Sequence, residues 1–256
     1  MRHLKIVFFF LFPALFNALS AAAQDRISDS ILFETLKQKA EWMYKGNELL
    51  SLNQGVHYMA IDLTENYEFS IEENNYWYVI ESSLKDGKRI FNQTCYDQNL
   101  VSDSSSYFTD TTLSLYVRAL QIAHQALITV NDSLNFLWES HIDRQNDSLF
   151  EVIFVPAFQP SGQAIYGITL DYIVNAAANK ISSSSIHFSG IKTLWIGQPR
   201  TIWLNYRTET EPEIGGVYFA WNYKDYFTKT YLDLKDRTYL LQKDQAGVYG
   251  WTVREK

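Results

Sequence analysis

Residues 1–23 limit what the rest of the chain can fold into more than any other stretch. Arg2 and Lys5 precede an apolar run over residues 6–16, and three consecutive alanines end the segment. A basic start, a short apolar run and small residues before a cleavage point are typical of a secretory signal peptide. We therefore expect this segment to be removed and the mature chain, 24–256, to be exported, either to the periplasm or to the extracellular space.

An uncleaved membrane anchor is the alternative interpretation of this segment. Residues 4–23 nearly reach the length of about 20 residues that spans a bilayer. Pro13, Asn17 and the alanine run favour cleavage, because a spanning helix gains nothing from them. No later apolar stretch is long enough to cross a membrane, so we expect no transmembrane segment in the mature chain.

The chain contains one cysteine, Cys95, and therefore forms no internal disulfide. A mature chain of this length can bury a core without one, and 46% hydrophobic and 16% aromatic residues agree with a folded protein. An exported protein of this size without disulfides is more typical of bacteria. Loss of the leader with its two basic residues leaves 20 basic and 29 acidic residues, a net charge of −9. That charge repels polyphosphates, so nucleic acid is not an expected partner.

The apolar spacing and the turn signals predict an α+β fold. Helical spacing predicts an amphipathic helix over residues 28–50 and a long central helix over residues 110–138. Between them, alternating residues at 67–72 and turn signals at 73–75 and 86–87 predict a β-meander of three or four strands.

In the second half, residues 139–147 read as a polar connector. A strand at 149–155, a short strand at 164–168 and a third helix over 170–181 are expected to follow. The remainder predicts an antiparallel sheet whose strands are 191–196, 201–207, 216–223, 226–232, 237–242 and 247–253.

Helices do not alternate regularly with strands in this pattern, so a doubly wound parallel sheet is not expected. We expect one domain over residues 24–256. Two lobes divided near residues 182–190 are the alternative.

The densest group of possible metal ligands is Glu139, His141 and Asp143. At a spacing of two they would line one face of an extended segment, and their donor atoms suit a hard or borderline metal ion. The simpler interpretation is a solvated connector with Arg144 as a local charge partner. We expect no cofactor and no metal, with these three residues as the candidates if a metal is bound.

Two further places carry residues that catalysis could use. His124 lies on the apolar stripe of the long helix, where it is either a general base facing a pocket or a hydrogen-bonded core histidine. Ser182–Ser185 precede His187, but a serine beside a histidine needs an orienting acid, which the sequence does not identify. We therefore expect the serine run to be a loop.

Aromatic residues are concentrated in the C-terminal β region. We expect Trp203, Trp221, Tyr218 and Tyr206 to form a ligand-binding or partner-binding surface, since flat aromatic rings suit flat apolar ligand faces, including sugars. Packing in the core is the alternative, because aromatic pairs across strands are common in sheets.

Together these observations favour an exported, soluble, non-catalytic protein that binds a ligand or an envelope protein partner. The sequence contains no Gly-x-Ser-x-Gly, His-Glu-x-x-His or paired-cysteine motif. The alternative is an exported hydrolase without a short motif, which would use His124 or His141 within the group Glu139, His141 and Asp143.

Overall fold

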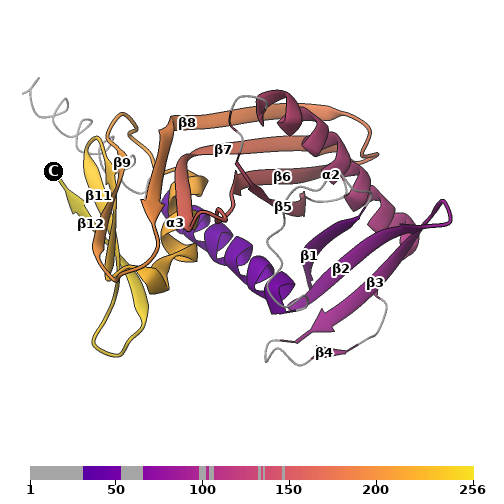
Figure 1. Ribbon diagram of the computed structural model, residues 1–256, viewed down its shortest axis with the longest axis horizontal. Coiled ribbons are helices and arrows are strands. Elements are labelled where there is room, and N and C mark those ends of the chain that lie inside the picture. The colour runs from indigo at the N-terminus through magenta and orange to yellow at the C-terminus, as the bar shows by residue number, and fades with distance from the viewer. Residues whose placement is uncertain are drawn as a thin grey trace, which may run out of the picture.

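The computed structural model describes residues 31–52, 66–97, 102–103, 107–131, 134, 136–145 and 148–256. The predicted signal peptide and the start of the first predicted helix lie outside these ranges. Within them, three helices pack against three four-stranded sheets (Figure 1), which confirms the α+β class.

The N-terminal helix occupies residues 31–52 of the described chain. Its buried side chains are Phe33, Ala40, Met43, Leu49 and Leu50. Phe33, Ala40, Met43 and Leu50 lie on one side of the helix, and Leu49 extends the buried surface against sheet A, so the predicted amphipathic helix is confirmed over its described part.

Sheet A is the predicted meander, with strands β1 (Tyr67–Glu73), β2 (Tyr76–Lys85), β3 (Lys88–Tyr96) and β4 (Ser102–Asp103), antiparallel in that order. Both predicted turns are confirmed. Asn74 and Asn75 have φ of 53° and 66°, and Asp86 and Gly87 have φ of 52° and 73°. Positive φ at both central residues is what a two-residue type I′ hairpin requires.

Helix α2 (Asp110–Asn131) packs against both sheet A and sheet B. It is apolar on more than one face because a sheet covers it from two directions. The predicted end at residue 138 is wrong. The helix ends at Asn131, and Trp138, which is buried in the same core, begins the next strand.

Sheet B contains β5 (Trp138–Gln145), β6 (Leu149–Pro156), β7 (Gln163–Asn175) and β8 (Ile181–Trp195), antiparallel in that order. Three expectations fail here. The predicted connector 139–147 contains strand β5. Residues 170–181, predicted as a helix, form the end of β7 and the turn into β8. The serine run Ser182–Ser185, predicted as a loop, lies within β8. The boundary considered near 182–190 also falls inside β8.

The physical reason for the error over residues 170–181 is that the central strands of sheet B are covered on both faces. Strand β7 is buried along most of its length, so it is apolar without the alternation of a half-exposed strand. Its β-branched residues, among them Ile168, Ile173 and Val174, are the signal that favours a strand.

A bulge at Gly167 and Gly190 switches the faces of β7 and β8. Tyr166 pairs with Lys192, and the next regular pair is Ile168 with Phe188. Both glycines have positive φ, 94° and 91°. Because of this bulge, Tyr166 packs in the core around the N-terminal helix, whereas Ile168 packs in the core around α2.

Sheet C has the order β12-β11-β10-β9, with strands β9 (Thr201–Tyr206), β10 (Lys229–Leu234), β11 (Arg237–Lys243) and β12 (Tyr249–Glu255). The strands β9 and β10 are parallel, so sheet C is mixed and the prediction of a purely antiparallel sheet is wrong. The short helix Lys224–Tyr226 precedes β10.

The predicted strand 216–223 is also wrong, because it lies in helix α3 (Ile214–Asn222). Parallel neighbours require a crossover connection, and α3 supplies part of it between β9 and β10. Most residues of α3 are buried, so its sequence shows no amphipathic period. Gly216 permits close packing, since a Cβ there would lie 3.0 Å from both Leu232 and Tyr206.

The N-terminal helix crosses the molecule between the sheets (Figure 1). Its apolar side contacts sheet A through Leu49 and Leu50, and it shares a core with sheet B, sheet C and α3 through Phe33, Ala40 and Met43. Helix α2 covers the opposite face of sheets A and B. The inner face of sheet B therefore lies beneath the N-terminal helix and α3.

Replacing Gly167 by alanine should destabilise the protein more than replacing Gly190. Both substitutions force an alanine into positive φ, which costs about 1–2 kcal/mol. At Gly167 the new Cβ would also lie 2.2 Å from the carbonyl oxygen of Gly190, whereas nothing lies within 4 Å at Gly190. We expect Gly167→Ala to cost about 2 kcal/mol more than Gly190→Ala in urea unfolding. Equal costs would show that the close approach across the bulge is not tight.

Candidate functional site

The inner face of sheet B carries a group of buried polar side chains. On β5, Glu139, His141 and Asp143 alternate with residues that face α2, as the spacing of two predicts for an extended segment. Burial under the N-terminal helix and α3 makes this face different from the solvated connector that the sequence suggests.

Glu139 is hydrogen-bonded to helix α3. The Tyr218 hydroxyl donates to Glu139 Oε2 at 2.6 Å, and the Asn47 amide of the N-terminal helix donates to the Tyr218 hydroxyl at 3.4 Å. Burial raises the pKa of the Glu139 carboxyl to about 7, although the hydrogen bond from Tyr218 acts in the opposite direction. A carboxyl group that titrates near neutral pH has the property that general acid–base chemistry uses.

His141 lies next to Glu139 and is also buried. Its Nε2 is 3.9 Å from Glu139 Oε2, and its ring is enclosed by Trp42 and Tyr218 at centroid distances of 6.4 and 5.2 Å. Burial lowers the pKa of His141 to about 3. The imidazole is therefore neutral at pH 7, and its Nε2 has no hydrogen-bond partner.

Asp143 is bound to a different set of side chains. Gln145 Nε2 donates to Asp143 Oδ2 at 2.8 Å and to Glu151 Oε2 at 2.9 Å, and Lys39 forms an ion pair with Glu151. Burial raises the pKa of Asp143, with a further contribution from Glu151. Within the described ranges, no group of three His, Cys, Asp or Glu side chains is arranged to hold a metal ion.

Asp171 on β7 belongs to the same face. Burial, and then the charge of Glu151, raises its pKa to about 6, and its Oδ1 is buried without a partner. Sequence inspection misses Asp171 because it lies within a stretch that reads as helix, and its neighbours Glu151 and Lys39 are distant in the chain.

His124 lies on α2 between aromatic rings. Its ring stacks on Tyr67 at 5.8 Å and lies 5.1 Å from Phe154. Burial lowers its pKa to about 4, so the ring is neutral at pH 7, and its Nε2 has no hydrogen-bond partner. His124 is thus half-buried at its position on the apolar stripe.

The four aromatic candidates do not form one surface. Tyr206 and Tyr218 are 2% and 3% exposed and line the core, and Trp221 packs partly buried against it. Trp203 is 56% exposed on the outer face of sheet C. It stacks flat on Tyr231, with ring centroids 4.8 Å apart and planes at 7°. Sequence inspection misses Tyr231 because its pairing with Trp203 depends on the parallel register of β9 and β10.

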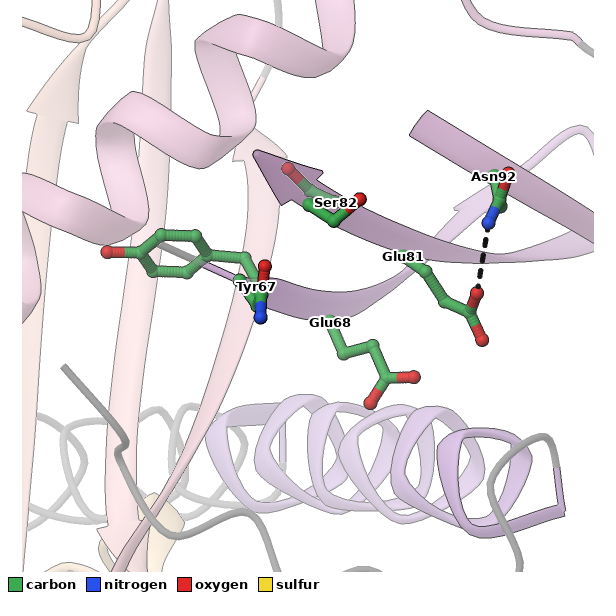
Figure 2. A pocket seen from close by; sticks show the side chains of 7 residues that line it. Tyr67, Glu68, Glu81, Ser82 and Asn92 are labelled. Carbon is green, nitrogen blue, oxygen red and sulfur yellow. Dashed lines mark hydrogen bonds between the residues drawn. The ribbon is translucent and has the colours of Figure 1, made fainter. Parts of the chain in front are cut away.

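A hollow of about 290 Å³ opens on sheet A (Figure 2). Glu68, Glu81 and Asn92 form one row across β1, β2 and β3, and the Asn92 amide donates to Glu81 Oε2 at 3.4 Å. Burial, and then the charge of Glu81, raises the pKa of Glu68 to about 7. Two carboxylates directly opposite one another repel, so this hollow is acidic and the pair destabilises the folded protein at neutral pH.

Comparison with known proteins gives no match: no family, no curated protein and no solved structure is similar to this chain. Among the described helices, none combines the length and hydropathy needed to span a bilayer.

Replacing Glu139 by glutamine should change how stability depends on pH. The folded pKa of Glu139 is above its ordinary value of 4.5, so its contribution to stability is present below pH 4.5 and is lost as the pH rises through 7. We expect Glu139→Gln to gain stability relative to the native protein between pH 4.5 and 7, by at most roughly 3 kcal/mol. Urea unfolding across this range measures the difference. Replacing the exposed Glu211 by glutamine is the control, and its stability should follow the pH dependence of the native protein. If Glu139→Gln also follows the native pH dependence, the Glu139 carboxyl is solvated and the prediction is wrong.

Replacing Glu68 by glutamine should stabilise the protein at pH 8 and leave it unchanged at pH 4. Below pH 4.5 the Glu68 carboxyl is protonated in both the folded and unfolded states, so no repulsion is relieved. Above pH 7 the variant removes a half-buried charge together with its repulsion from Glu81, and the repulsion alone is worth about 0.5 kcal/mol for directly opposed like charges. Thermal unfolding at the two pH values measures this, and an equal shift at both would exclude the charge of Glu68 as the cause.

Proposed function

We propose that this protein is an exported binding or envelope-assembly protein that recognises its ligand or partner through Trp203 and Tyr231. The observation that carries the proposal is the exposed Trp203 ring, stacked on the half-buried Tyr231 on the outer face of sheet C. Stacked aromatic rings that remain open to solvent offer a rigid apolar platform at low entropic cost.

Polar residues border the ring pair on both sides. One neighbouring row across the strands consists of Thr201, Lys229 and Gln242, and the other of Asn205, Asp233 and Thr238. Asp233 is held by Arg207 at 2.6 Å and by Lys256 at 2.7 Å. A flat apolar centre with hydrogen-bonding groups around it suits a sugar ring or a planar side chain of a protein partner.

Export is part of this proposal. It is supported by the signal-peptide pattern of residues 1–23. The export compartment of a bacterium is where an envelope glycan or an envelope protein partner would be met.

The alternative is an exported hydrolase that uses His124 or the group Glu139, His141 and Asp143. The pKa of Glu139, raised to about 7, is the observation that favours this alternative. Its immediate surroundings are Tyr218, Asn47 and Trp42, which enclose this part of β5. A substrate would therefore require displacement of the N-terminal helix.

Replacing Trp203 by alanine should weaken ligand binding about 30-fold or more, since a central aromatic contact contributes about 2 kcal/mol or more. Tryptophan fluorescence would be titrated with soluble oligosaccharides of glucose, xylose and N-acetylglucosamine, and with detergent-extracted envelope proteins. Tyr231→Ala should have a comparable effect.

Trp195→Ala is the matched control, because Trp195 is 60% exposed but lies at the end of β8. If Trp195→Ala weakens binding as much as Trp203→Ala does, the ring pair is not the specific site. The absence of any response from the native protein to all these probes would count against the proposal itself.

A further inference from the structure

A serine, a histidine and a glutamate lie side by side in space where β8 meets the start of α3. The Ser185 hydroxyl oxygen lies 3.3 Å from His187 Nε2, within hydrogen-bonding distance. The other ring nitrogen, His187 Nδ1, lies 3.8 Å from Glu213 Oε1. These are the atoms that a nucleophile, a base and an orienting acid use in a Ser-His-acid triad.

The pairing of β7 with β8 and the start of α3 set this geometry. Ser185 and His187 are two residues apart on β8 and so share a face, opposite Asp171 and Thr169 of β7. Helix α3 begins against the same strand, because a Cβ at Gly215 would lie 1.8 Å from the Thr169 hydroxyl. The start of α3 thereby brings Glu213 to His187, which the sequence separates by 26 positions.

Glu213 is available to act on the histidine. It precedes the first residue of α3 in the capping position, but its side chain makes no capping hydrogen bond. Its side chain is 15% exposed, and burial raises the pKa of its carboxyl group although the nearby His187 acts in the opposite direction. The first turn of the same helix carries backbone N–H groups without intrahelical acceptors, which are the type of donor that stabilises an oxyanion.

We propose that Ser185, His187 and Glu213 form a hydrolytic site for carboxylic esters, with Ser185 as nucleophile, His187 as general base and Glu213 as positioning residue. This activity goes beyond the proposed binding function and does not depend on Trp203 or Tyr231.

The reaction balances with water as the second substrate. Ser185 Oγ bonds to the acyl carbon as His187 Nε2 takes the hydroxyl proton, and the bond to the leaving alcohol breaks as Nε2 returns that proton to it. Water then attacks the acyl-enzyme, and His187 takes its proton and passes it to Ser185. The products are one alcohol and one carboxylic acid.

The openness of the site indicates the substrate class. Ser185 is exposed, and the His187 side chain is 41% exposed at the edge strand of sheet B. Transition-state charge is less strongly stabilised in a solvated site than in a dry one. Esters with small acyl groups and good leaving groups fit such a site better than amides do.

The first experiment labels the nucleophile. The folded full chain is treated with diisopropyl fluorophosphate, and the modified peptide is identified by mass spectrometry. We expect one label per chain, at Ser185, and none in Ser185→Ala. Ser184→Ala is the matched control, because Ser184 is also exposed but pairs with Tyr172, one register step from the pair of Ser185 and Asp171, and so faces the other side of the sheet. It should retain full labelling. Labelling at any other residue, or none, would overturn the proposal.

The second experiment measures hydrolysis of p-nitrophenyl acetate. Ser185→Ala and His187→Gln should lower kcat at least 100-fold, while Ser184→Ala leaves it unchanged. Both positions are exposed enough that folding, checked by circular dichroism, should be intact. Hydrolysis that persists in Ser185→Ala at the native rate would show a surface reaction and overturn the assignment.

The role of Glu213 is tested by separating its effects on kcat and KM. The charged groups that face His187 are Glu213 from α3 and Asp171 from β7, with Glu209 close to Glu213. Because Glu213 acts through His187 and not on the substrate, Glu213→Gln should lower kcat 10-fold or more at unchanged KM, and Glu213→Asp should restore part of the rate. An unchanged kcat in Glu213→Gln, or no recovery in Glu213→Asp, would exclude Glu213 from the site.

Discussion

The contact of the N-terminal helix with all three sheets holds the described structure together. Phe33 stacks on Tyr239 of sheet C at 4.0 Å, Lys39 forms an ion pair with Glu151 of sheet B, and Trp42 stacks on Trp77 of sheet A at 6.2 Å. A helix of 22 residues is about 33 Å long, which is enough to reach from one end of a small domain to the other. Burying each large apolar side chain of this helix contributes roughly 1.5–3 kcal/mol.

The same helix explains why sheet B buries charge on its inner face. It brings one lysine, Lys39, to a face that carries Asp143, Glu151 and Asp171. With fewer cations than carboxylates in a buried setting, the pKa values of Asp143 and Asp171 rise instead of falling. The pKa of Glu139 rises for the same reason, since its hydrogen bond comes from the Tyr218 hydroxyl and not from a cation. The polar face is thus a consequence of where the helix lies.

The exposed positions of sheets B and C differ from this buried group of carboxylates. The edge strand β8 exposes Ile186 and Phe188 on the side of α2, and Ser185 and His187 on the side of α3. Sheet C exposes Trp203 while its other face fills a core. Both surfaces expose functional side chains to solvent. A ligand or substrate can therefore reach them without movement of the N-terminal helix.

The sequence by itself determined the elements whose signal is local. The N-terminal helix, the two type I′ turns of sheet A, most of α2 and the strand β6 follow from spacing and turn residues. The mostly buried elements did not, because β7 and α3 bury side chains on both faces and the periodicity that separates strand from helix is lost. Only the tertiary structure decided which side chains meet: Trp203 with Tyr231, Glu139 with Tyr218, and Ser185 and His187 with Glu213. The reason is physical, since each of these groups depends on the register of a sheet or on the position of a helix end, and neither is encoded within the neighbouring residues.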